Sequence, residues 1–171
     1  QTDTTPPASV NNLSAGSPTT TSITLSWTAP GDDGSTGTAS SYDVRYSTST
    51  ITSANWASAA QVSGEPAPQV AGSSQSMTVS GLNSSTKYYF AMNTSDEAGN
   101  ISGLSNIANA TTLSGNQPPV LTTIGSKTVQ EGDTLTFVVN ASDPNNDPLT
   151  YSATGLPSGV TFASQTFSWA P

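Results

Sequence analysis

The sequence predicts an all-β protein made of two antiparallel β-sandwich domains in tandem, the second of them lacking its last strands. Short segments in which apolar and polar residues alternate recur along the chain, and clusters of turn-forming residues separate them. No segment shows the apolar spacing of an amphipathic helix. At 171 residues the chain has room for one complete sandwich of about 100 residues and part of a second.

Four segments of the first domain place apolar side chains on one face of a strand. Turn-forming runs separate these segments, including 30–34 and 96–100. Because alternate residues of a strand point to opposite sides, each segment has one face for the core and one for water. The residues expected to face inward are Ile23, Leu25 and Trp27; Tyr42, Val44 and Tyr46; Met77 and Val79; and Tyr88, Phe90 and Met92.

The segment 114–119 reads Ser-Gly-Asn-Gln-Pro-Pro and predicts a linker. Glycine makes such a segment flexible, and neither proline can donate a hydrogen bond to a sheet. We therefore expect a first domain over 1–113 and a second over 120–171. In the second domain, strands are predicted at Leu135, Phe137 and Val139, at Leu149 and Tyr151, and in a hairpin of Val160, Phe162, Phe167 and Trp169 that turns near 163–165.

Charge restricts the partners of this chain. Its formal net charge is −8 at pH 7, and its only cations are Arg45, Lys87 and Lys127. Three separated cations cannot form a phosphate-binding patch, so nucleic acid is excluded as a partner. No run approaches the roughly 18 apolar residues of a membrane span. Because the chain begins at Gln1 rather than Met, we expect a processed chain or a piece of a longer protein.

The residue types needed for catalysis are largely missing. The sequence has no His and no Cys, which excludes imidazole bases, thiol nucleophiles and the usual zinc sites. Asp32 with Asp33, and Glu131 with Asp133, are close in sequence. Glycosidase carboxylates face each other across a cleft at about 5 to 9 Å, which neighbours in one turn do not achieve. The sequence therefore predicts a protein that is not an enzyme.

Residues 6 to about 113 resemble a bacterial-type fibronectin type III domain. The resemblance implies a seven-stranded sandwich in which Leu82 and Tyr88 form a tyrosine corner: the phenol oxygen bonds back to upstream backbone and fixes a crossing between the sheets. The motifs that carry it are Pro6-Pro7, the segment 22–27 ending in Trp27, the segment 41–46, Gly81-Leu82 followed by Tyr88, and 96–100.

Residues 117–171 resemble the start of a cadherin-like, immunoglobulin-type domain of bacterial surface and secreted proteins. The carrying motifs are 116–120, 131–135, 141–151, 155–160 and 167–171. In the family a further pair of strands follows the Trp169 region. Two interpretations stay open: the chain is a fragment, or a strand donated by another protein domain or subunit completes the sandwich.

The cadherin-like resemblance also implies a calcium site, formed by Glu131, Asp143, Asn145 and Asp147. Calcium prefers several oxygen ligands, and the last three residues present side-chain oxygens at alternating positions of one turn. The alternative is that Asp143 and Asp147 only shape turns before their prolines. For Asp32, Asp33, Asp96 and Glu97 of the first domain, turn formation is the favoured interpretation.

Together these observations predict a non-catalytic structural or adhesive module, acting as a spacer or assembly unit in a secreted protein, a cell-surface protein or an extracellular filament. The alternative is an accessory or carbohydrate-binding domain of a secreted hydrolase, with Trp56 and Tyr89 as the candidate sugar-stacking rings. A third reading is a calcium-dependent homophilic adhesin. Asn-x-Ser/Thr sequences, among them those at Asn12, Asn83, Asn93, Asn100 and Asn140, leave glycosylation open.

Overall fold

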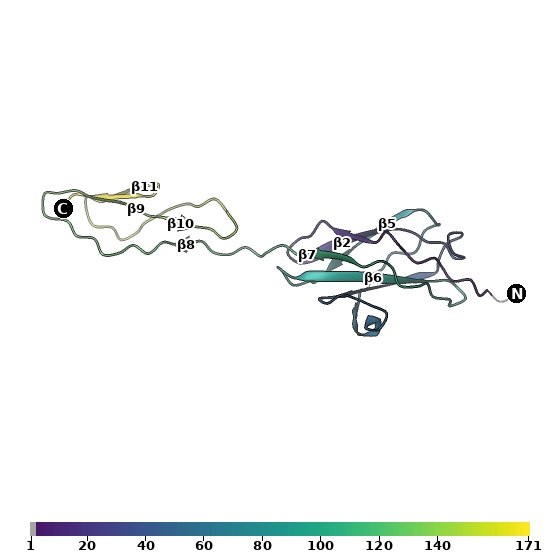
Figure 1. The fold of residues 1–171 in the computed structure, drawn as a ribbon. Helices are drawn as coiled ribbons and strands as arrows, with labels where there is room; N and C mark the ends of the chain where they lie inside the picture. The colour runs from purple at the N-terminus through teal and green to yellow at the C-terminus, as the bar shows by residue number, and fades with distance from the viewer. Residues whose placement is uncertain (1–2) are drawn as a thin grey trace. The chain divides into compact units, whose positions relative to one another are not determined.

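The computed structural model describes residues 3–171, and the predicted domain residues Gln1 and Thr2 lie outside that range. The chain divides into two compact units, the first running to Gly115 and the second covering Asn116–Pro171. The division falls inside the segment 114–119 that the sequence analysis assigned to a linker. Each unit has its own sheets (Figure 1).

Unit 1 consists of two antiparallel sheets. Three strands form one sheet in the order β1-β2-β5, and four strands form the other in the order β4-β3-β6-β7. A single 3-10 turn, η1, lies between β3 and β4, and no α-helix occurs in the range 3–171. The bounds are β1 Ser14–Gly16, β2 Ser22–Thr28, β3 Ser41–Ser47, η1 Trp56–Ser58, β4 Ala60–Gln61, β5 Ser74–Ser80, β6 Lys87–Ser95 and β7 Ala108–Thr111.

The core of unit 1 lies between these sheets and contains every side chain expected to face inward. Leu25 and Phe90 are fully buried, and the rings of Trp27 and Tyr42 meet edge to face with centroids 5.2 Å apart. Tyr46 and Met77 are only partly buried against this cluster. Met77 lies on β5, an edge strand of the smaller sheet, where fewer neighbours cover it.

The tyrosine corner expected from the sequence is present. The backbone N–H of Asn83 donates a hydrogen bond of 3.0 Å to the phenol oxygen of Tyr88, and Leu82 is buried beside it. This bond fixes the connection between β5 and β6, which belong to different sheets.

Unit 2 contains two smaller antiparallel sheets. One pairs β8 (Val120–Leu121) with β10 (Ala141–Ser142). The other has the order β11-β12-β9, with bounds Thr161–Ala163, Thr166–Trp169 and Leu135–Val138. Phe137 lies opposite Phe167 in the register, and their rings stack with centroids 4.8 Å apart.

The hairpin of unit 2 turns at Ser164, which adopts a positive φ of 56°, close to the position expected. The strand predicted at Leu149 and Tyr151 is wrong, because these residues have no ladder partner. Pro148 precedes them and carries no N–H, so it cannot extend a sheet at this point. Their side chains line an apolar groove instead.

Candidate functional site

The acidic residue Asp96 of unit 1 shapes a turn. Its two carboxylate oxygens accept hydrogen bonds from Asn100, at 2.7 Å from the backbone N–H and 2.8 Å from the side-chain amide. Burial acts to raise the pKa of Asp96, but these bonds, with the backbone N–H groups of Ala98 and Gly99, lower it overall. The carboxylate therefore stays ionised and satisfies the loop backbone.

Asp32 and Asp33 lie in an electrostatically unfavourable environment. Burial raises the pKa of Asp32, and a hydrogen bond and charge repulsion from Glu97 raise it further. Repulsion from Asp3 is the main cause of the raised pKa of Asp33. Within residues 3–171, no group of three or more His, Cys, Asp or Glu is arranged to hold a metal ion.

The four residues proposed for calcium lie on two turns of unit 2. Glu131 lies on an exposed turn before β9. One carboxylate oxygen of Asp143 accepts hydrogen bonds from the backbone N–H groups of Asn145 at 2.7 Å and Asp147 at 3.2 Å. The side-chain oxygen of Asn145 accepts a 2.7 Å bond from the N–H of Gln117. These bonds support the turn-forming role of Asp143, and calcium binding stays a prediction.

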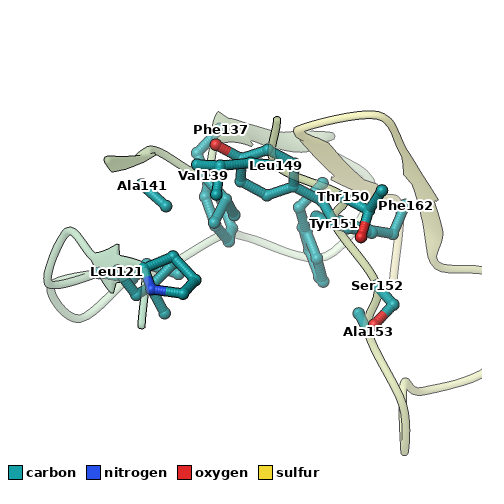
Figure 2. Close-up of a pocket in the computed structure, with 13 residues that line it drawn as sticks. Leu121, Phe137, Val139, Ala141, Leu149, Thr150, Tyr151, Ser152, Ala153 and Phe162 are labelled. Carbon is teal, nitrogen blue, oxygen red and sulfur yellow. The ribbon is translucent and has the colours of Figure 1, made fainter. Parts of the chain in front are cut away.

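An open apolar groove of about 390 Å³ lies between the sheets of unit 2 (Figure 2). Phe137, Val139 and Leu149 contribute to its lining. Among the residues that the structure describes in unit 2, Val139 is the one hydrophobic side chain classed as buried. Such a groove is what strand donation into this unit requires, and donation itself stays a prediction.

The two candidate sugar-stacking rings both belong to unit 1 and are partly exposed. Tyr89 of β6 lies opposite Ser47 of β3, and the next pair on the same side of the sheet joins Arg45 to the buried Ala91. The guanidinium of Arg45 lies 4.8 Å from the Trp56 ring centroid. The rings are thus associated with the same outer face of the β4-β3-β6-β7 sheet. A cation covers Tyr89 as well, because Lys87 lies 5.2 Å from its ring centroid.

Trp56 also borders a pocket that the sequence analysis did not predict. Asp43 and Arg45 of β3 and Asn93 of β6 line it beside the tryptophan. Asp43 and Arg45 are two positions apart on one strand, so alternation places them on the same face. That signal was available in the sequence, whereas the approach of Trp56 depends on how the β3–β4 connection folds.

The fold defines a class: tandem modules built as antiparallel β-sandwiches. The chain belongs to the fibronectin type III family, because the model named "Fibronectin type III domain" matches residues 6–111. A second family model, described as "Putative Ig domain", matches residues 118–171. In the range 3–171, no helix has the length and apolar character to cross a bilayer.

Among curated proteins, the chain is similar to Chitinase A1 of Niallia circulans, at 38% identity over 111 residues. That match covers 64% of this chain and 13% of the chitinase. Among solved structures it is similar to titin kinase with its flanking domains (20% identity, TM-score 0.46, 64% of this chain and 18% of that one). It is also similar to the chicken CNTN1 FN1–FN3 domains (20% identity, TM-score 0.45, 63% of this chain and 33% of that one).

Proposed function

We propose that the chain is a non-catalytic spacer in an extracellular multidomain protein. The observation that carries the proposal is the β-sandwich of unit 1, whose two sheets pack their facing sides around one hydrophobic core. Its acidic loops are engaged in turns, as the bonds to Asp96 illustrate. Such a module holds the domains on either side of it apart without needing a ligand.

The extracellular setting is supported by composition and by similarity. Only 8% of the residues are charged, and three are basic. Chitinase A1, which shares 38% identity over 111 residues, is named for a polymeric substrate. Because a polysaccharide polymer is too large to enter a cell, it is degraded outside, and we expect a related module there too.

The spacer role is tested by the distance between the two units. The chain has no native Cys, so Ser76→Cys on β5 and Thr136→Cys on β9 can carry two spin labels at exposed positions. Pro118 and Pro119 restrict the connecting backbone, and we therefore expect a narrow distribution of label distances by pulsed electron paramagnetic resonance. A broad distribution, as from a flexible tether, would contradict a positioning role.

A second candidate is an accessory module of a secreted polysaccharide hydrolase. The similarity to Chitinase A1 favours it. The test is sedimentation of the chain with insoluble chitin and with cellulose. Retention on either polymer supports the accessory role, and complete recovery in the supernatant supports a spacer that makes no contact with substrate.

A further inference from the structure

A pocket of about 350 Å³ lies on the outer face of the larger sheet of unit 1. Its volume is near the lower end of the range for small-molecule sites, about 300 to 1,000 Å³. Asp43 and Asn93 are directly opposite each other on β3 and β6 and form part of its lining. The lining also includes the side chains of Arg45, Trp56 and Ile101.

Hydrogen bonds hold the guanidinium of Arg45 in place. Its Nε and Nη2 donate to the two carboxylate oxygens of Asp43 at 3.0 and 2.9 Å, and Nη1 donates to the carbonyl of Trp56 at 3.2 Å. The guanidinium also lies over the indole ring of Trp56. Because Asp43 and Arg45 neutralise each other, this polar site has no net charge. Neither an anion nor a cation is favoured as its occupant.

Asn93, in the lining of this pocket, has a side-chain atom whose hydrogen-bonding capacity is not satisfied. Its side-chain oxygen is buried and has no hydrogen-bond partner. Rotating the amide by half a turn would put its nitrogen there and leave the same deficit. An unpaired buried polar group costs about 1 to 3 kcal/mol, so a ligand that donates to Asn93 would recover free energy on binding.

Apolar surface borders these polar groups. The indole of Trp56 is partly exposed, and Ile101 is 63% exposed. A sugar ring combines C–H faces, which pack on such surfaces, with hydroxyl groups that both donate and accept hydrogen bonds. We propose that this pocket binds a neutral saccharide: the ring packs on Trp56 and Ile101, and its hydroxyl groups bond Asn93 and Asp43. The inference goes beyond the spacer role and does not depend on it.

Nuclear magnetic resonance titration of the whole chain with chitotriose and with cellotriose tests the site. Its three indole N–H signals belong to Trp27, Trp56 and Trp169. With at least one of the two sugars, we expect the signals of Trp56 and the Asn93 side chain to move, with a dissociation constant of about 1 mM. Trp27 is buried in the core and Trp169 belongs to unit 2, so their signals should stay in place.

Two variants and one matched control locate the binding. Trp56→Ala and Asn93→Leu should each weaken binding about tenfold or more. Asn93→Leu removes an unpaired buried amide, so its melting temperature should equal or exceed that of the unmodified chain, which separates lost binding from lost folding. Tyr89→Ala changes a ring on the same sheet face but outside the pocket lining, and binding should persist.

Three outcomes overturn the proposal. They are no movement of the Trp56 and Asn93 signals with either sugar, movement that survives both variants, or movement of these signals by a Ser/Thr-rich peptide but by neither sugar. The last outcome would identify a protein-binding pocket instead. None of these outcomes bears on the distance distribution between the units, so failure of this site and failure of the spacer role are distinguishable.

Discussion

The hydroxyl groups of Thr112, which follows β7, and of Tyr88 in β6 bond to the backbone that precedes β6. Thr112 is 3% exposed, and its Oγ1 donates to the carbonyl of Asn83 at 2.6 Å and accepts from the N–H of Thr86 at 3.0 Å. The phenol oxygen of Tyr88 accepts from the N–H of Asn83. Backbone groups in loops must find partners when they are removed from water, and here side chains provide them.

Tyr88→Phe should lower the free energy of unfolding by about 1 to 2 kcal/mol, because it leaves the N–H of Asn83 without its partner. Tyr89→Phe is the matched control, since Tyr89 points to the opposite face of the same strand. Chemical denaturation of the two variants measures the difference. Equal stabilities would show that the corner bond contributes nothing.

Asp33→Asn should raise the melting temperature at neutral pH, because it removes a carboxylate that Asp3 repels. The pKa of Asp33 is raised in the folded state, so the folded chain binds a proton at this carboxylate more readily than the unfolded chain does. The free energy of unfolding therefore falls as the pH rises above the usual value of 3.8 and through the folded pKa. The gain should therefore vanish below that value.

Thermal melts of Asp33→Asn and the unmodified chain across this pH range give the measurement. Added salt should shrink the difference at neutral pH, because it screens exposed charges. A gain that persists in strong acid would mean that repulsion is not its source.

At the scale of elements, turns determine where strands can pair. In unit 1 the longer strands, such as the seven-residue β2 and β5, bury one face. In unit 2 the turn 143–148 contains two prolines, and the segment after it does not join a sheet. Asp143 organises that turn through two backbone N–H groups.

Asp143→Ala should destabilise unit 2 by about 1 kcal/mol, through the loss of these hydrogen bonds. If the residue only shapes the turn, calcium and a chelator should leave the melting temperature of the unmodified chain unchanged. Calorimetry with each additive is the measurement. A calcium-dependent rise that Asp143→Ala abolishes would instead support the calcium site of Glu131, Asp143, Asn145 and Asp147.

At the scale of the whole molecule, the three residues after which trypsin can cut differ in the structure that surrounds them. Arg45 and Lys87 lie in hydrogen-bonded strands of the larger sheet of unit 1, whereas Lys127 is exposed in the irregular segment between β8 and β9. Trypsin requires a locally opened chain, and opening a central strand costs far more free energy than opening a loop.

Brief digestion with trypsin should therefore cut first after Lys127 and leave unit 1 intact. The resulting fragment should keep the melting transition of unit 1, because no residue of its core lies beyond the cut. Mass spectrometry and circular dichroism provide the two readouts. Early cleavage after Arg45 or Lys87 would contradict the closed sandwich.

Local alternation explains why so much of unit 1 could be predicted. A residue in an extended segment points to the side opposite its neighbours. The alternating apolar residues Ile23, Leu25 and Trp27 therefore predict a buried face whichever strands lie beside them, and all three are buried. The same reasoning failed at Leu149 and Tyr151, because alternation shows that a strand would have an apolar face but not that a partner strand is available.

The sequence by itself determined the β class, the tandem arrangement and the inward-facing residues, because these depend on neighbours within a few positions. Only the tertiary structure decided that Trp56 meets Arg45 and that Asn93 lies opposite Asp43. The same holds for the groove beside Phe137. Such contacts join residues from different strands and connections, and their free energy depends on sheet register and loop path, which no local pattern encodes.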